Sequence, residues 1–250
     1  MFIDTHCHLE KDYYDDFDKV IKDNIDAGCK YMIVSFCDYK GIEEGIPLIN
    51  RYSCLYSTIG FHPEEVDRLP NDYISYLENL IKSNKKIVGI GEIGLDYHYG
   101  KENRDKQIKL FESQLALAEK LNMPVCIHTR DATEDTINSL KKFHLKGVIH
   151  CFSGSYETAC IYIKMGFKLG IGGTLTFKNS KLPLTLSRLY LDDLVLETDS
   201  PYLTPTPFRG QTNSSKYIPY IIDKISSIYG VSFEKVEEIT NKNVKYVYNI

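Results

Sequence analysis

Short runs of β-branched and other apolar residues recur along the chain, and a longer segment with helical spacing or polar character follows each run. The pattern predicts eight strands, at residues 1–4, 30–35, 55–60, 86–91, 124–127, 147–149, 167–171 and 194–196. The clearest helix spans residues 107–121, because apolar residues recur there on one face. Further helices are predicted at 14–27, 41–51, 73–83, 133–143, 155–165, 184–189, 215–229 and 232–248, the last two on either side of the stop signal Gly230.

Eight strand–helix units in 250 residues average about 31 residues each, which is the length of a βα unit that crosses back to lie parallel to its predecessor. The sequence therefore predicts an α/β fold, a (β/α)8 TIM barrel of parallel strands with an extra C-terminal helix. An open doubly wound sheet is the alternative, but a glycine-rich loop is expected after its first strand, where this chain has Asp-Thr-His-Cys-His. No linker or charge block is evident, so one domain over residues 1–250 is expected.

The composition of the chain excludes several classes of protein. The chain is 43% hydrophobic and 26% charged, which excludes disordered and fibrous proteins, and its net charge of -4 gives no overall basic field. Any binding of nucleic acid must therefore be local. Seven cysteines without a C-x-x-C pair argue against a disulfide framework and a thiolate zinc cage. We find neither a signal peptide nor a run of about 18 apolar residues, and expect a cytoplasmic location.

Potential metal ligands gather where the predicted strands end, which is where a barrel places its reactive side chains. The histidines of the pair His6-Cys7-His8 point to one side of an extended segment, because side chains alternate in a strand. Such a pair alone is a weak signal. The full set of donors is too large for one four-coordinate ion, and two divalent ions that share a carboxylate fit it better: His6, His8, Glu92, His128, His150 and Asp199. Two neighbouring ions suit phosphoester hydrolysis.

Six short blocks along the chain are similar to a known family. They are Asp-Thr-His-Cys-His-Leu (residues 4–9), Gly-Phe-His-Pro (60–63), Gly-Glu-Ile-Gly-Leu-Asp-Tyr (91–97), His-Thr-Arg-Asp-Ala (128–132), His-Cys-Phe-Ser-Gly (150–154) and Glu-Thr-Asp-Ser-Pro-Tyr (197–202). Together they resemble, in order, the signature blocks of the TatD family of metal-dependent deoxyribonucleases, from Asp4 to Asn243. The departures are in the tail: Ser214-Ser215 follows Asn213 where the family usually has Glu-Pro, and Tyr248 stands where a Phe is usual.

The resemblance implies a barrel of the amidohydrolase-like superfamily that hydrolyses DNA, often as a 3′-5′ exonuclease that prefers single strands. It implies that one ion is held by His6, His8 and Asp199, a second by His128 and His150, and that Glu92 bridges the two. The position of Glu92 after the fourth predicted strand, between the first strand and the fifth and sixth, agrees with a bridging role.

The expected mechanism is in-line attack by a metal-activated hydroxide, with Asp199 and Glu92 as the catalytic carboxylates. Asp199 would orient the attacking water or take its proton. Arg130 is predicted to bind phosphate, with a salt bridge to Asp131 or another neighbouring residue as the alternative. His62 is predicted to contact the phosphate or a base, with simple loop packing against Pro63 as the alternative.

The loop after the eighth strand carries further predicted substrate contacts, Tyr202 and Arg209. Four imidazoles favour zinc, while two carboxylates admit manganese or magnesium. DNA is expected as a transient partner of a monomer, without a membrane or an obligate protein partner. The alternative function is hydrolysis of another ester or amide by the same site, such as an aminoacyl-tRNA ester or a lactone. A non-catalytic metal- or DNA-binding protein is disfavoured, because no ordinary DNA-binding module is present.

Overall fold

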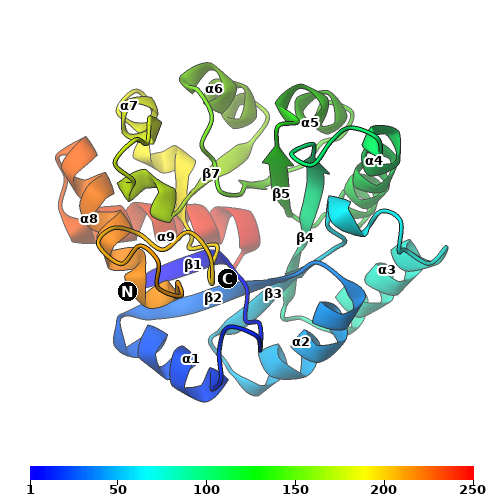
Figure 1. Cartoon of the computed structure of the whole chain (residues 1–250), viewed down its shortest axis with the longest axis horizontal. Helices are drawn as coiled ribbons and strands as arrows, with labels where there is room; N and C mark the ends of the chain where they lie inside the picture. The colour runs from blue at the N-terminus through cyan, green and yellow to red at the C-terminus, as the bar shows by residue number, and fades with distance from the viewer. The chain divides into compact units, whose positions relative to one another are not determined.

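The computed structural model describes all residues, 1–250, and contains the eight predicted strands. Figure 1 shows the strands and the helices that lie between them. They follow one another in the sheet order β1 to β8, which is the order of a (β/α)8 barrel, as expected from the sequence. Their bounds are β1 (Phe2–Cys7), β2 (Cys29–Phe36), β3 (Leu55–Ile59), β4 (Ile87–Asp96), β5 (Val125–Arg130), β6 (Gly147–Ile149), β7 (Phe167–Ile171) and β8 (Leu194–Leu196).

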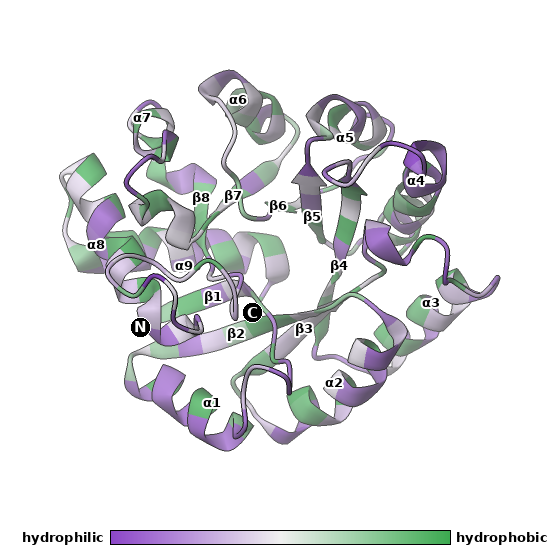
Figure 2. Cartoon of the chain, viewed as in Figure 1, coloured by the Kyte–Doolittle hydropathy of each residue, from purple (hydrophilic) through white to green (hydrophobic).

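The predicted helices are also present, and the extra helix at the C-terminus is α9. Figure 2 shows polar and apolar residues alternating along α1 and α3, as expected of helices with one buried side. Gly230, at φ 64°, ends the helix before α9, as predicted. The helices are α1 (Phe17–Asp26), α2 (Tyr39–Arg51), α3 (Tyr73–Ser83), α4 (Arg104–Leu121), α5 (Thr133–Leu140), α6 (Tyr156–Lys164), α7 (Leu182–Leu186), α8 (Ile218–Tyr229) and α9 (Phe233–Tyr248), with short 3-10 turns η1 (Pro63–Glu65), η2 (Gly173–Thr176), η3 (Leu191–Asp193) and η4 (Ser215–Tyr217).

Three strands, β1, β4 and β5, extend at least three residues further than predicted at their carboxyl ends. His6, Glu92 and His128 were expected just after their strands, but they lie inside β1, β4 and β5. The pairing of β4 with β5 continues to Asp96 and Arg130. Because ladder hydrogen bonds join backbone groups, a strand continues through polar residues as long as its neighbour does. An apolar run therefore marks the buried part of a strand and underestimates its length.

The first of two compact units comprises residues 1–34 and 150–250. Its strands pair in parallel, β1 with β2 and β7 with β8, and a parallel bridge joins Cys7 to Ser200 just beyond β8. Buried Asn213 holds the loop after β8, because its Nδ2 donates to the carbonyls of Thr198 at 2.9 Å and Tyr202 at 2.6 Å. Helix α9 is joined to the same region through Asn243, whose Nδ2 lies 2.7 Å from the carbonyl of Leu194 at the start of β8.

The second unit comprises residues 35–149 and contains β3 to β6 in parallel order. Two buried glutamines, seven residues apart on α4, each form a pair of hydrogen bonds with one backbone residue. The side chain of Gln114 accepts from Phe61 N at 2.8 Å and donates to Phe61 O at 3.0 Å. The side chain of Gln107 likewise accepts from Asp96 N and donates to Asp96 O, both at 2.9 Å. Helix α4 therefore fixes the backbone after β3 and at the end of β4.

Two further expectations concern covalent links and membranes. All seven cysteines are free thiols, as expected from their odd number and spacing. None of the helices combines the length and the apolar character needed to cross a bilayer.

Candidate functional site

The first group of metal-compatible side chains begins with the two histidines of β1. His6 lies within the strand and His8 directly follows it, and the Nε2 atoms of the two rings are 3.1 Å apart. Both residues are buried. The Cys7 thiol between them turns instead to the carbonyl of Ile33 on β2, 3.7 Å away. The strand thus presents both imidazoles to one side, as the H-x-H spacing predicts.

Asp199 completes this group in the same unit. Its Oδ1 lies 3.5 Å from Nε2 of His6 and 3.5 Å from Nε2 of His8. Ligands of a tetrahedral ion with bonds of ~2.1 Å are ~3.4 Å apart, so the three donor atoms have the mutual spacing of ligands on one ion. Imidazole nitrogen and carboxylate oxygen are also the donor types that a divalent transition ion prefers. This donor set fits a metal.

Backbone hydrogen bonds to β1 hold Asp199 in place. Its N–H donates to the carbonyl of His6 at 3.0 Å, and the N–H of His8 donates to Ser200 O at 2.7 Å. Burial would raise the pKa of Asp199, but electrostatic interaction with the His150 ring and hydrogen bonds from His6 and His8 lower it below its ordinary value. A carboxylate with a lowered pKa is suited to hold a cation and to orient a water more than to accept a proton.

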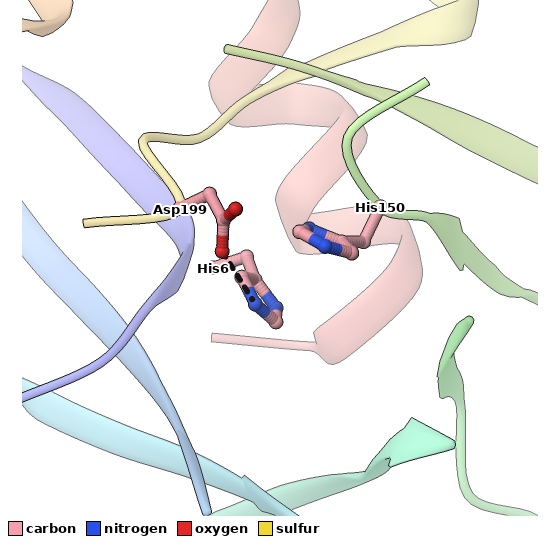
Figure 3. Close-up of side chains that lie close together, drawn as sticks. All are labelled: His6, His150 and Asp199. Carbon is pink, nitrogen blue, oxygen red and sulfur yellow. Dashed lines mark ion pairs between the residues drawn. The ribbon is translucent and has the colours of Figure 1, made fainter. Parts of the chain in front are cut away.

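His150 joins this group from the residue after β6. Its ring stacks on that of His6, with centroids 3.8 Å apart, and Figure 3 shows both rings beside the Asp199 carboxylate. Ligand atoms of His6, His150 and Asp199 all lie within 4.8 Å of one another. The first unit therefore brings together four of the six predicted metal ligands.

The other two predicted ligands, Glu92 and His128, meet in the second unit. Glu92 lies within β4 and His128 within the neighbouring β5, and Nδ1 of the ring is 2.8 Å from Glu92 Oε1. The second ring nitrogen, Nε2, is 3.0 Å from Oδ2 of Asp96. Burial lowers the pKa of His128, but hydrogen bonds to Asp96 and Glu92 outweigh burial and raise it to about 9. The carboxylates of Glu92 and Asp96 therefore strongly favour a positive charge between them, either a protonated His128 ring or a metal ion.

His62 lies beside this pair, at the start of η1. Its ring centroid is 4.5 Å from that of His128, and its Nε2 is 4.0 Å from Glu92 Oε1. Nδ1 accepts a hydrogen bond from the N–H of Glu64 at 3.3 Å. In a neutral ring the other nitrogen then carries the proton, so Nε2 is a donor rather than a metal ligand. Substrate binding by His62 stays a prediction.

The predicted phosphate contact Arg130 ends β5, two residues beyond His128, and its side chain is exposed. The guanidinium carbon lies 5.7 Å from the ring centre of Tyr99. The neighbouring Asp131 contacts Nδ1 of His98 at 3.2 Å.

The loop after β8 carries the remaining predicted contacts. Tyr202 is 43% exposed, and its ring meets Tyr13 edge to face, with centroids 5.5 Å apart, and His8 at 6.5 Å. The exposed ring therefore borders a predicted metal ligand. The guanidinium carbon of Arg209 lies 3.9 Å from the ring centre of Phe177, so this arginine packs on an aromatic ring of its own unit.

Sequence analysis missed Asp96, which contacts a predicted ligand. A usable signal was present, because Glu92 and Asp96 are four residues apart in one strand and side chains with even spacing share a face. The fourth strand was predicted to end at residue 91, so the shared face of Glu92 and Asp96 was not recognised.

Two buried acids in the first unit were also missed. Glu197 precedes Asp199 by two residues, is fully buried, and places Oε1 3.3 Å from Nδ1 of His150. Asp4 precedes His6 by two residues and accepts hydrogen bonds of 2.7 Å from the hydroxyls of Thr198 and Ser215. Burial raises the pKa of Asp4 to about 6, against the lowering effect of those hydrogen bonds. Asp4 ties β1 to the segments that follow β8.

Comparisons with known proteins support the resemblance. The family described as TatD related DNase matches residues 3–249. The uncharacterized metal-dependent hydrolase YabD of Bacillus subtilis is 38% identical over 255 residues, which covers 100% of both chains. The hydrolase YcfH of Escherichia coli, also described as uncharacterized and metal-dependent, is 31% identical over 99% of this chain and 96% of its own.

A solved structure agrees with the fold. YjjV, a TatD homologue from Escherichia coli, superposes with a TM-score of 0.93 at 28% identity, covering 100% of this chain and 98% of its own. This confirms the predicted (β/α)8 barrel. With the family match over almost the whole chain and imidazole and carboxylate donors spaced for metal binding, the chain belongs to the TatD family of metal-dependent hydrolases.

Proposed function

We propose that the protein is a deoxyribonuclease that hydrolyses phosphodiester bonds with two bound divalent ions, acting as a 3′-5′ exonuclease on single-stranded DNA. The observation that carries this proposal is the ligand-like spacing of His6, His8 and Asp199, whose donor atoms are 3.1 to 3.5 Å apart. The description of the matching family as a DNase supports DNA as the substrate. In this proposal the protein is a single-domain cytoplasmic monomer that meets DNA only transiently.

In the proposed site, His6, His8 and Asp199 hold one ion, His128 and His150 hold the other, and Glu92 serves both. All six residues lie in the carboxyl-terminal half of a strand or shortly beyond its end, on the side where barrel enzymes carry their active sites. Divalent ions bound there would lower the pKa of water and neutralise charge on a phosphoryl group. The mixed nitrogen and oxygen donors favour zinc and also admit manganese or magnesium.

The chain's own side chains have separate roles in the proposal. Asp199, with its lowered pKa, remains ionised and orients the attacking water through a carboxylate oxygen. His62 donates from Nε2 to a phosphate oxygen. Arg130 and Arg209 bind further phosphates, and the exposed ring of Tyr202 stacks on a base.

Incubation of the full-length protein with end-labelled DNA tests the proposal. Single- and double-stranded substrates, labelled at either end, are compared in zinc, manganese, magnesium and chelator. We expect metal-dependent shortening of single strands from the 3′ end. The Glu92→Gln protein, purified in the same way, controls for a contaminating nuclease.

A panel of lactones and aminoacyl esters tests the alternative bond types in the same experiment. Metal-dependent cleavage of one of these, with intact DNA in every metal, would overturn the nuclease assignment. The metal-dependent hydrolase family would be unaffected.

A further inference from the structure

We propose that Asp96 and Glu197 are positioning residues that each hold one metal-binding histidine by the ring nitrogen facing away from the ion. The inference rests on the proposed assignment of His128 and His150 as metal ligands. Neither acid is among the six proposed ligands. Each pair lies within one compact unit, so the two pairs are independent observations.

The first pair is Asp96 with His128. If Glu92 and His128 bind the same ion, the ligating nitrogen is Nδ1, because this atom lies 2.8 Å from Glu92 Oε1. The opposite nitrogen, Nε2, is then available to donate to Asp96 Oδ2 at 3.0 Å. Metal-bound histidines commonly donate their second N–H to a carboxylate, which fixes the tautomer and the ring orientation.

Asp96 is itself held firmly enough for this role. Its Oδ1 accepts the backbone N–H of His98 at 2.8 Å, so the two carboxylate oxygens have different partners. Its backbone N–H and C=O are both bonded to the side chain of Gln107. Asp96 is also buried, with 6% of its surface exposed. Apart from the contact with His128, three hydrogen bonds restrain Asp96, one to its carboxylate and two to its backbone. An acid held in this way sets the orientation of the ring that donates to it.

The second pair is Glu197 with His150. Glu197 Oε1 lies 3.3 Å from Nδ1 of His150 and accepts the backbone N–H of the next residue, Cys151, at 2.5 Å. One carboxylate oxygen therefore contacts the ring and the backbone beside it. This approach of His150 Nδ1 to Glu197 is a close contact without full hydrogen-bond geometry. With Nδ1 turned to Glu197, the nitrogen left for a metal is Nε2.

The surroundings of Glu197 indicate that its carboxylate has a role in the metal-binding site rather than in packing. The residue is fully buried, and its Oε2 accepts no hydrogen bond, which is costly for a carboxylate. On β7, a Cβ at Gly170 would lie only 2.0 Å from that oxygen, so the strand leaves space for the acid by having glycine there. A buried apolar side chain would have served packing better, so we assign the carboxylate to orienting His150.

Metal binding by the full-length protein tests the inference without using any nucleic acid. We compare Asp96→Asn and Glu197→Gln with the wild type, measuring zinc stoichiometry at saturation and the dissociation constant by competition with a chelating indicator. Asp131→Asn and Glu157→Gln, which change exposed acids, are the matched controls. We expect unchanged stoichiometry, 10- to 100-fold weaker binding in the two test variants, and controls within twofold of the wild type.

Two outcomes would overturn the inference. A dissociation constant within twofold of the wild type would show that the acid does not position its histidine. Loss of a whole equivalent of zinc at saturation in Asp96→Asn would show instead that Asp96 is a ligand, as its proximity to His62 and His128 permits.

Nitrogen NMR on the wild-type protein covers the case in which a variant fails to fold. In the zinc-loaded protein we expect the ring of His128 to bind through Nδ1 and to carry its proton on Nε2, with the reverse for His150. The opposite tautomers would refute the inference. A protein that binds zinc in this way but leaves DNA intact would refute the proposed nuclease function alone.

Discussion

Glu92 offers the sharpest single-residue test of the site. Glu92→Gln keeps the shape of the side chain but removes the charge that lies 2.8 Å from His128. We expect hydrolysis to fall about 10³-fold, a loss typical of removing one group that stabilises charge in the transition state. His128→Ala should have the same effect.

Circular dichroism is expected to show an intact fold in both variants, because these side chains serve the site more than packing. Glu43→Gln, at an exposed position on α2, is the matched control and should keep full activity. Unchanged turnover of Glu92→Gln saturated with metal would contradict the proposed role of Glu92.

Arg130 tests phosphate binding separately from chemistry. Arg130→Ala should raise KM and reduce the slope of log KM against log salt by about one, as expected when one phosphate contact is lost. Its neighbour Asp131 already contacts His98, which weakens the alternative of an Arg130–Asp131 salt bridge. Lys141→Ala, an exposed charge change in the same unit, is the control. A salt slope equal to that of the wild type would make Arg130 structural.

His128 also predicts how the metal-free protein responds to pH. Its folded pKa of about 9 exceeds the unfolded value of about 6.5, so the folded state binds more protons between these values. The stabilisation from His128 is therefore complete below about pH 6.5 and is lost as pH rises to 9. We expect the free energy of unfolding in chelator to decrease by about 3 kcal/mol across this range, at ~1.4 kcal/mol per unit.

Urea unfolding of the wild type and His128→Gln at several pH values measures this effect. The variant should lack that part of the decrease, while other groups, such as Asp4, continue to contribute in both proteins. Parallel curves for the two proteins would show that His128 is not charged between its carboxylates.

At the scale of elements, helix α4 positions two segments that lead to the site. Gln114→Leu would leave the N–H and C=O of buried Phe61 without their partners, and each unsatisfied group costs about 1–3 kcal/mol. We expect a loss of about 2 to 4 kcal/mol in the free energy of unfolding. Lys109→Ala, on the same helix, should change it by less than about 0.5 kcal/mol. Equal stability of Gln114→Leu and the wild type would contradict the structural role of this amide.

The sequence predicted some elements better than others, for a physical reason. Helix α3 has the predicted bounds, and so do strands β6, β7 and β8, whose apolar runs coincide with their backbone pairing. Strands β1, β4 and β5 continue into polar residues, where only the neighbouring strand decides how far the ladder extends.

The same limit applies to the site. The motifs identified the six predicted ligands, and within each unit the structure brings its share of them together. They did not identify Asp96, because the fourth strand was predicted to end at residue 91. They did not identify Glu197 either, because its contact with His150 joins residues more than 30 positions apart, and local spacing carries no information about such a contact.

For the whole molecule, bound metal should contribute to stability as well as to chemistry. We expect protein purified without chelator to contain at least half an equivalent of zinc or another transition ion, because four imidazoles bind such ions ahead of magnesium. We expect activity to rank the metals differently from affinity, because looser binding of an ion such as magnesium or manganese favours release of the product. Zinc at 100 times its dissociation constant should stabilise the fold by about 2.7 kcal/mol.

Elemental analysis and thermal unfolding with and without chelator measure both quantities. The Glu92→Gln protein should gain less stability from zinc than the wild type. If the protein contains less than about half an equivalent of any transition metal and is fully active in magnesium alone, the site binds metal weakly and through its oxygen ligands.

The two glutamines of α4 also oppose local opening of the second unit. The amide protons of Phe61 and Asp96 are held by side chains of one helix, so neither can exchange with deuterium unless that helix separates from the backbone beyond β3 or at the end of β4. Since Asp96 contacts His128, the same separation would disturb a proposed metal ligand. Deuterium uptake at these two amides should therefore report the free energy of this separation, and with it how readily the contact between Asp96 and His128 is transiently lost.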